Sequence, residues 1–135
     1  MITIRWLVVG KYATIDRETA DVSIFGAMAG IAPVGLPAVF PGLAVVADLK
    51  REQGDPPTIG ITLRILTNGA EQFVQPVAVD FQDKFLCHVA VNIQNALVTE
   101  PGSMTFELSG PGIEARTFDL EVHVPQPLAS PVTGT

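Results

Sequence analysis

The 135-residue sequence has few of the side chains that usually carry chemistry, since it contains one cysteine and two histidines. Cys87 alone cannot form an internal disulfide, which is typical of proteins in a reducing compartment. One cysteine and two histidines are also too few for a cysteine-rich structural zinc site. We therefore expect a cytoplasmic protein without a cofactor.

Charge is scarce as well, because charged residues make up 16% of the chain and the formal net charge is −6. The eight basic residues are scattered, whereas a phosphate-binding face needs clustered Lys and Arg. Apolar stretches are interrupted by Gly and Pro well before the ~20 residues that a membrane helix needs. The start, MITIRWLVVGKYAT, has neither a basic leader nor a small-residue cleavage pattern. We expect no nucleic-acid binding and no membrane insertion.

Alternation of apolar and polar residues recurs along the chain, while no stretch keeps helical spacing over three turns. The pattern predicts strands at 2–9, 43–49, 59–65 and 85–93, and hairpins at 12–28 and 101–124. About eight short strands are typical of an all-β, antiparallel two-sheet β-sandwich, immunoglobulin-like or C2-like. We expect one such domain over residues 1–124 and a proline-rich extended tail over 125–135.

Local signals refine this expectation. Asn68-Gly69 is a strong hairpin signal because both residues accept a positive φ, and Pro76 in the return arm predicts an edge strand. Three prolines and three glycines in 30–42 predict an irregular crossing loop. The alternation changes phase inside the last hairpin, which predicts a β-bulge near Arg116-Thr117.

The first strand and its aromatic residue are expected to anchor the core. Alternation from residue 2 places Ile2, Ile4, Trp6 and Val8 on one side. Trp6 is the only tryptophan and Tyr12 the only tyrosine, whereas a sugar-binding platform needs several exposed aromatic rings. We therefore interpret Trp6 as a core residue.

An acidic row with a histidine is the first candidate site. Residues at i and i+2 of a strand point the same way, so Asp119, Glu121 and His123 share one face, and Glu107 lies on the partner strand. Such a set can bind a divalent ion or act as acid and base. A half-solvated sheet produces the same pattern, however, and a flat face has no pocket that shifts a pKa. We interpret the row as the solvated face of a sheet.

Acidic loops are the second candidate. Asp16, Glu18 and Asp21 share one loop, and Asp80 and Asp83 share another. Loop aspartates at one end of a sandwich can hold calcium, although this spacing matches no known calcium-loop motif. Calcium binding is kept as an alternative.

Cys87 and His88 are neighbours in a predicted strand, so their side chains point to opposite faces and cannot form a catalytic dyad. No GxSxG elbow, P-loop or GxGxxG segment occurs. We assign no catalytic, cofactor-binding or metal-binding residue and predict that the protein is not an enzyme.

A resemblance to known proteins rests on two segments, WLVVGKYATIDRETADVSIFGAMAGI at 6–31 and PGSMTFELSGPG with FDLEV near the end. With them the chain resembles a bacterial family of uncharacterised small single-domain β-sandwich proteins. The resemblance implies the fold and brings no activity and no site residues.

The leading functional hypothesis is a non-catalytic protein-interaction or assembly protein. Apolar side chains occupy both sides of some strands, as where Leu7 and Val9 oppose Trp6 and Val8. Monomers rarely leave large apolar patches exposed, so we expect burial in a homo-oligomer or against another protein. The alternative is a module that binds a small ligand or calcium.

Overall fold

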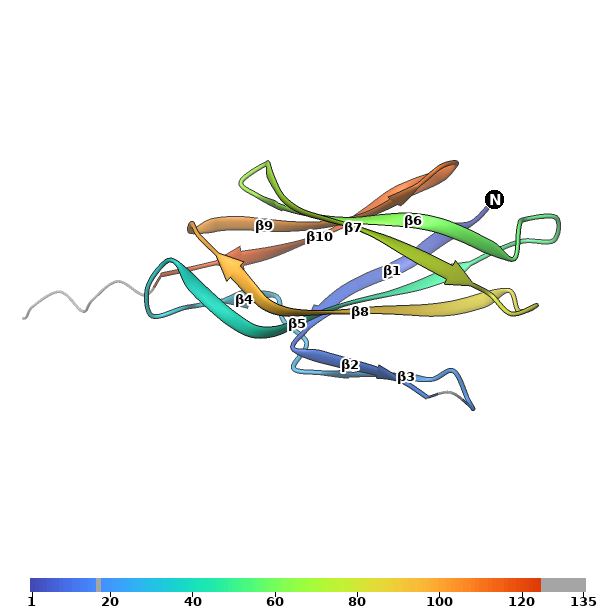
Figure 1. Ribbon diagram of the computed structural model, residues 1–135, viewed down its shortest axis with the longest axis horizontal. Helices are drawn as coiled ribbons and strands as arrows, with labels where there is room; N and C mark the ends of the chain where they lie inside the picture. The colour runs from blue at the N-terminus through green and yellow to red at the C-terminus, as the bar shows by residue number, and fades with distance from the viewer. Residues whose placement is uncertain (17, 125–135) are drawn as a thin grey trace, which may run out of the picture.

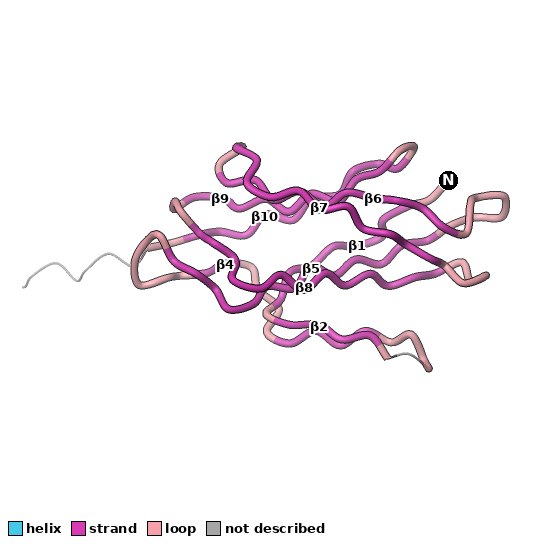
Figure 2. The backbone as a smooth tube through the Cα atoms, viewed as in Figure 1, coloured by secondary structure: helices cyan, strands magenta, loops and turns pink. Residues whose placement is uncertain are grey.

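The computed structural model describes residues 1–16 and 18–124 and is all-β, with ten strands and no helix within these residues (Figures 1 and 2). It confirms the predicted all-β class. The strands are β1 (Thr3–Gly10), β2 (Tyr12–Ile15), β3 (Val22–Phe25), β4 (Gly30–Ile31), β5 (Ala38–Lys50), β6 (Thr58–Thr67), β7 (Ala70–Asp80), β8 (Leu86–Val98), β9 (Gly102–Gly110) and β10 (Ile113–Val122). Across the described ranges, nothing helical is long and apolar enough to span a membrane. The predicted tail, 125–135, lies outside the described residues.

The strands form three sheets, so the expected count of two is wrong. A three-stranded sheet has the order β1-β5-β8, a five-stranded sheet the order β4-β10-β9-β6-β7, and β2-β3 pair with each other. Pairing is antiparallel except between β4 and β10, which run parallel. The third sheet arises because the chain turns back after Gly10 and lays the β2–β3 hairpin across the outer side of the three-stranded sheet (Figure 1).

The two larger sheets lie in separate layers and share one apolar core (Figure 1). β5 supplies Leu43, Val45, Ala47 and Leu49 to it, and β9 supplies Met104, Phe106 and Leu108 from the facing sheet. Alternate residues of each strand point inward because side chains alternate sides with a period of two. The core therefore depends on the alternation that the sequence displays.

A bulge in β1 changes which residues reach that core. Its register with β5 shifts between Ile4 and Trp6, so Ile4, Leu7 and Val9 point inward, whereas Trp6 and Val8 point outward. The prediction that Trp6 shares a face with Ile4 is wrong for this reason. Trp6 instead packs beside a second, smaller cluster under the hairpin, formed by Ala13, Ala44 and Val46.

Asn92 on β8 holds the hairpin over the sheet. Its Oδ1 accepts a hydrogen bond from the Ala13 N–H at 3.2 Å, and its Nδ2 donates to the Ala13 carbonyl at 3.1 Å. One side chain thus satisfies both polar groups of a residue that is 2% exposed.

Replacing Asn92 with alanine is expected to lower the free energy of unfolding by about 1–3 kcal/mol, since two buried main-chain groups lose their partners. The loss should appear first as faster amide hydrogen exchange at Ala13 and along β3, ahead of the main core. Gln94→Ala, on the same strand, is the control and should leave exchange in the hairpin unchanged. Equal exchange in all three proteins would contradict this role.

Several local predictions are confirmed. Asn68 and Gly69 have φ of 49° and 86° and join β6 to β7, which is an edge strand containing Pro76. The register of β10 with β9 shifts by one residue between Ile113 and Arg116, adjoining the predicted bulge.

The predicted irregular loop over 30–42 is confirmed only for residues 32–37. Gly30–Ile31 forms the additional strand β4, and β5 begins at Ala38, earlier than predicted. β5 tolerates Pro41 because the pairing with β8 skips that position, between Phe40↔Ala96 and Gly42↔Gln94. Asn95, which lies opposite Pro41, has a φ of 55°, so the regular strand pairing is interrupted at this position. Proline at such an interruption removes no hydrogen bond from the ladder.

Candidate functional site

The acidic row lies on the outward side of the five-stranded sheet. Asp119 and Glu121 are exposed, and Glu107 is half-buried on the neighbouring strand. The Thr105 hydroxyl donates to Asp119 Oδ1 at 2.7 Å, and His123 Nε2 lies 3.5 Å from Glu121 Oε2, with both of these side chains about two-thirds exposed or more. Asp119, Glu121 and His123 are thus exposed, as expected for a solvated face.

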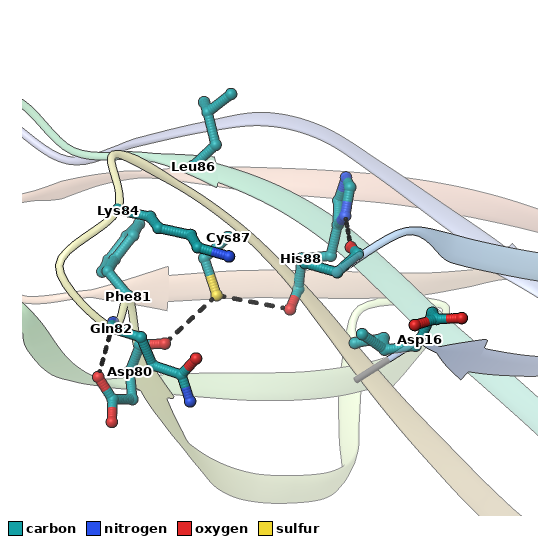
Figure 3. A pocket seen from close by; sticks show the side chains of 10 residues that line it. Asp16, Asp80, Phe81, Gln82, Lys84, Leu86, Cys87 and His88 are labelled. Atoms are coloured by element: carbon teal, nitrogen blue, oxygen red, sulfur yellow. Dashed lines mark hydrogen bonds between the residues drawn. The ribbon is translucent and has the colours of Figure 1, made fainter. Parts of the chain in front are cut away.

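Parts of the two acidic loops come together at a cavity of about 440 Å³ (Figure 3). We call it the turn cavity; it is lined by Ile15, Asp16, Ala20, Asp80, Phe81, Gln82, Lys84, Leu86, Cys87 and His88. The hairpin end, the β7–β8 turn and the start of β8 build its walls. Asp16 and Asp80 thus share a cavity, whereas Glu18, Asp21 and Asp83 do not line it.

Both carboxylates in the turn cavity are engaged by their own turns. Asp16 Oδ1 accepts the Glu18 N–H at 2.8 Å and the Thr19 N–H at 3.0 Å, and these hydrogen bonds, first from Thr19 and then from Glu18, lower the pKa of Asp16. Asp80 Oδ1 accepts the Gln82 N–H at 2.9 Å. Across residues 1–16 and 18–124, no three His, Cys, Asp or Glu side chains gather in a way that could hold a metal ion. The carboxylates act here as turn formers.

Cys87 and His88 lie on opposite faces of β8, as predicted. Cys87 packs against the main core, and its Sγ lies 3.7 Å from the Asp80 carbonyl and 3.5 Å from the His88 carbonyl (Figure 3). The imidazole of His88 points the other way, and its Nδ1 donates to the Ala20 carbonyl at 2.9 Å (Figure 3). The thiol and the imidazole therefore cannot exchange a proton directly.

Burial raises the pKa of the Cys87 thiol, and the negative charges of Asp80 and Asp48 raise it further. Because the thiolate is the nucleophile, Cys87 in the folded chain should react with iodoacetamide at pH 8 more slowly than in the unfolded chain. The folded thiol keeps its proton longer, so the free energy of unfolding should also fall as the pH rises past the ordinary value of 9.0. Mass-detected alkylation measures the rates; equal rates with and without denaturant would contradict the shift.

A buried charge lies beneath the hairpin, at a place that the sequence analysis did not single out. Asp48 on β5 is 1% exposed, and cross-strand pairing sets Trp6 on one side of it and His88 on the other. Arg5 Nε donates to Asp48 Oδ2 at 2.6 Å, and His88 Nε2 lies 3.5 Å from Asp48 Oδ1. The ring centroids of Trp6 and His88, the two cross-strand partners of Asp48, are 5.8 Å apart. The only signal in the sequence is a lone aspartate inside the apolar run 43–49.

This arrangement gives His88 a positioning role. The His88 ring lines the turn cavity, but its Nδ1 donates to the Ala20 carbonyl and its Nε2 lies 3.5 Å from Asp48 Oδ1, so both nitrogens face groups of the chain itself. A general base needs a nitrogen within hydrogen-bond reach of the substrate proton. The ring instead joins β8 to the end of the hairpin through the Ala20 carbonyl and lies beside the buried carboxylate of β5.

The outer side of the hairpin carries exposed aromatic side chains. Tyr12 and Phe25 are cross-strand partners, are 53% and 55% exposed, and stack with ring centroids 6.1 Å apart. Thr14 and Ser23 continue the same side and are also exposed. These four residues, the hairpin face, form an uncharged surface on a chain whose net charge is −6.

One protein-family model matches residues 5–123 of the chain, and its description is a family of unknown function (DUF6941). No curated protein matches the chain.

Proposed function

The chain belongs to this family of unknown function, and we propose that it is a non-catalytic protein-interaction domain that self-associates through the hairpin face. The observation that carries the proposal is the stacked Tyr12–Phe25 pair, which stays more than half exposed. Aromatic side chains are enriched in the centres of protein interfaces, where they bury large areas at low entropic cost.

The construction of the hairpin supports this assignment. Its inner side chains, Ala13 and Ile24, already pack on the sheet in the second cluster. Tyr12 and Phe25 point outward and are not part of that cluster. Leaving two rings in water costs favourable burial energy, which association recovers. The neighbouring Thr14 and Ser23 are small and uncharged, so a second hairpin face can approach without charge repulsion.

A two-fold dimer is the simplest geometry. In a two-fold interface the same patch occurs on both subunits and must be complementary to itself. An uncharged face with one aromatic pair satisfies this condition, because each pair can stack on its counterpart. The charged residues of the hairpin lie at its ends, at Lys11 and in the loop that begins at Asp16, where an interface has its polar rim.

Sedimentation velocity on the variant Tyr12→Ser/Phe25→Ser tests the proposal. We expect the native chain to sediment as a dimer at micromolar concentration and the variant as a monomer, with Kd raised by about three orders of magnitude if the two rings together contribute about 4 kcal/mol. Val39→Ser/Leu97→Ser is the matched control, because Val39 and Leu97 are also exposed cross-strand partners, 60% and 51% exposed. A variant that keeps the native mass, or a control that loses it, would contradict the assignment to the hairpin.

The alternative function is a module for a small ligand or calcium at the turn cavity. The observation in its favour is that Asp16, Asp80 and Lys84 line one cavity of about 440 Å³. A ligand that binds only the folded state raises the melting temperature. If this alternative holds, millimolar calcium raises the Tm of the native chain but not that of Asp80→Asn, and an unchanged native Tm would exclude the calcium branch.

We also propose that the two larger sheets form a β-sandwich of the immunoglobulin-like or C2-like type, supported by the core that they share. A cytoplasmic location stays a prediction from the single cysteine.

A further inference from the structure

A groove of about 500 Å³, which we call the apolar groove, lies between β4 and the first part of β5. Ile31 and Leu43 line it and belong to the main core, and Met28 and Phe40 line it and pack against that core. The groove therefore opens onto the core, where an apolar occupant gains contacts on several sides. Its volume falls within the range of pockets that take small organic ligands.

Lys11 is the one charged residue that lines the apolar groove. It is exposed, and none of the ion pairs among residues 1–16 and 18–124 includes it. The net charge of −6 disfavours anions over the surface as a whole, whereas the groove carries a single positive charge. An apolar site with one cation is complementary to a ligand that has an apolar body and one anionic end.

Two glycines let Lys11 pack closely at the groove. Its N–H donates to the Phe25 carbonyl at 2.9 Å. Gly26 has a φ of 65°, and a β-carbon there would lie 2.9 Å from Lys11 Cδ, so the aliphatic stem lies against bare backbone. A β-carbon at Gly42, which lines the groove, would lie 3.2 Å from the Lys11 carbonyl oxygen. The absence of both β-carbons places the lysine beside the groove, with its stem packed and its charged end left to solvent or to a ligand.

We propose that the apolar groove binds a free amphipathic carboxylate of the medium-chain fatty acid class. Its hydrocarbon chain lies against Met28 and Phe40, and its carboxylate pairs with the Lys11 ammonium group. Each methylene that leaves water raises the affinity about fourfold, so the chain supplies most of the binding. The exposed ion pair adds about fivefold and selects a carboxylate over a neutral alcohol. This inference does not depend on the proposed function, because Tyr12 and Phe25 do not line the groove.

Methionine-methyl NMR on the full chain measures both the affinity and the position of the ligand, with decanoate below its micelle concentration as the probe. Met28 lines the apolar groove, whereas Met104 is 2% exposed in the core. On titration we expect the Met28 methyl signal to move to saturation while the Met104 signal stays in place. Octanoate should bind about 15-fold more weakly than decanoate, because two fewer methylenes leave water.

Lys11→Met tests the charge, since it keeps an aliphatic stem and removes the ammonium group. We expect this variant to bind decanoate about fivefold more weakly and decanol as tightly as the native chain does. Lys50→Met removes an exposed lysine that does not line the groove and should change neither affinity.

A Met28 signal that does not respond to decanoate would overturn the proposal. So would a Lys11→Met variant that binds decanoate as tightly as the native chain, or one that weakens decanol and decanoate equally. Repeating the titration on Tyr12→Ser/Phe25→Ser separates this inference from the proposed function. That variant should keep the native affinity for decanoate whether or not the native chain is a dimer, and a loss of binding would assign the ligand to the hairpin face instead.

Discussion

Replacing Arg5 with methionine is expected to lower the free energy of unfolding by about 3 kcal/mol. The change leaves Asp48, which is 1% exposed, without the guanidinium that donates to its Oδ2. An unpaired buried carboxylate is costly because the interior cannot replace its hydration. The expected value lies at the lower end of the usual range for breaking a buried pair because the Arg5 side chain is itself 46% exposed.

A double variant distinguishes this cause from loss of packing. Arg5→Met/Asp48→Leu removes both charges and fills the space with apolar groups, so it should be more stable than Arg5→Met alone. Urea denaturation with the Trp6 fluorescence as the probe measures all three proteins, since Trp6 is the cross-strand partner of Asp48. A double variant that loses at least as much stability as Arg5→Met would contradict the account of a buried, paired charge.

Phe106→Ala is the second change with a large expected effect, a loss of about 3–5 kcal/mol in the free energy of unfolding. Phe106 is 0% exposed in the core between the two larger sheets, so its removal leaves a cavity. Phe25→Ala makes the same chemical change at a residue that is 55% exposed and should cost less than about 1 kcal/mol.

Measuring both phenylalanine variants at a concentration where the native chain is monomeric keeps association out of the comparison. Urea midpoints and slopes from circular dichroism give the two free energies. Similar losses for Phe106→Ala and Phe25→Ala would contradict the placement of the core between the larger sheets.

Strands could be predicted from the sequence because alternation is a local signal. Ile61, Leu63 and Ile65 alternate with polar residues or glycine and form β6 as expected. Which face a residue occupies proved less predictable, since the bulge between Ile4 and Trp6 inverts β1 without any residue that marks it. The proline and glycine content wrongly predicted a loop at Pro41, which lies in β5. The pairing with β8 skips this position, so the proline removes no hydrogen bond from the strand ladder.

The third sheet and the buried charge could not be predicted because both depend on contacts far apart in sequence. Asn92 and Ala13, which fix the hairpin, are separated by 79 residues, and Arg5 and Asp48 by 43. No local pattern specifies such partners. By contrast, the opposite faces of Cys87 and His88 followed from strand geometry alone.

We propose self-association through the uncharged hairpin face, and the molar mass of the chain in solution tests this proposal most directly. Sedimentation equilibrium of the native full chain at micromolar concentration should give twice the chain mass of 14.3 kDa. A mass of 14.3 kDa that persists across the micromolar range would contradict the claim.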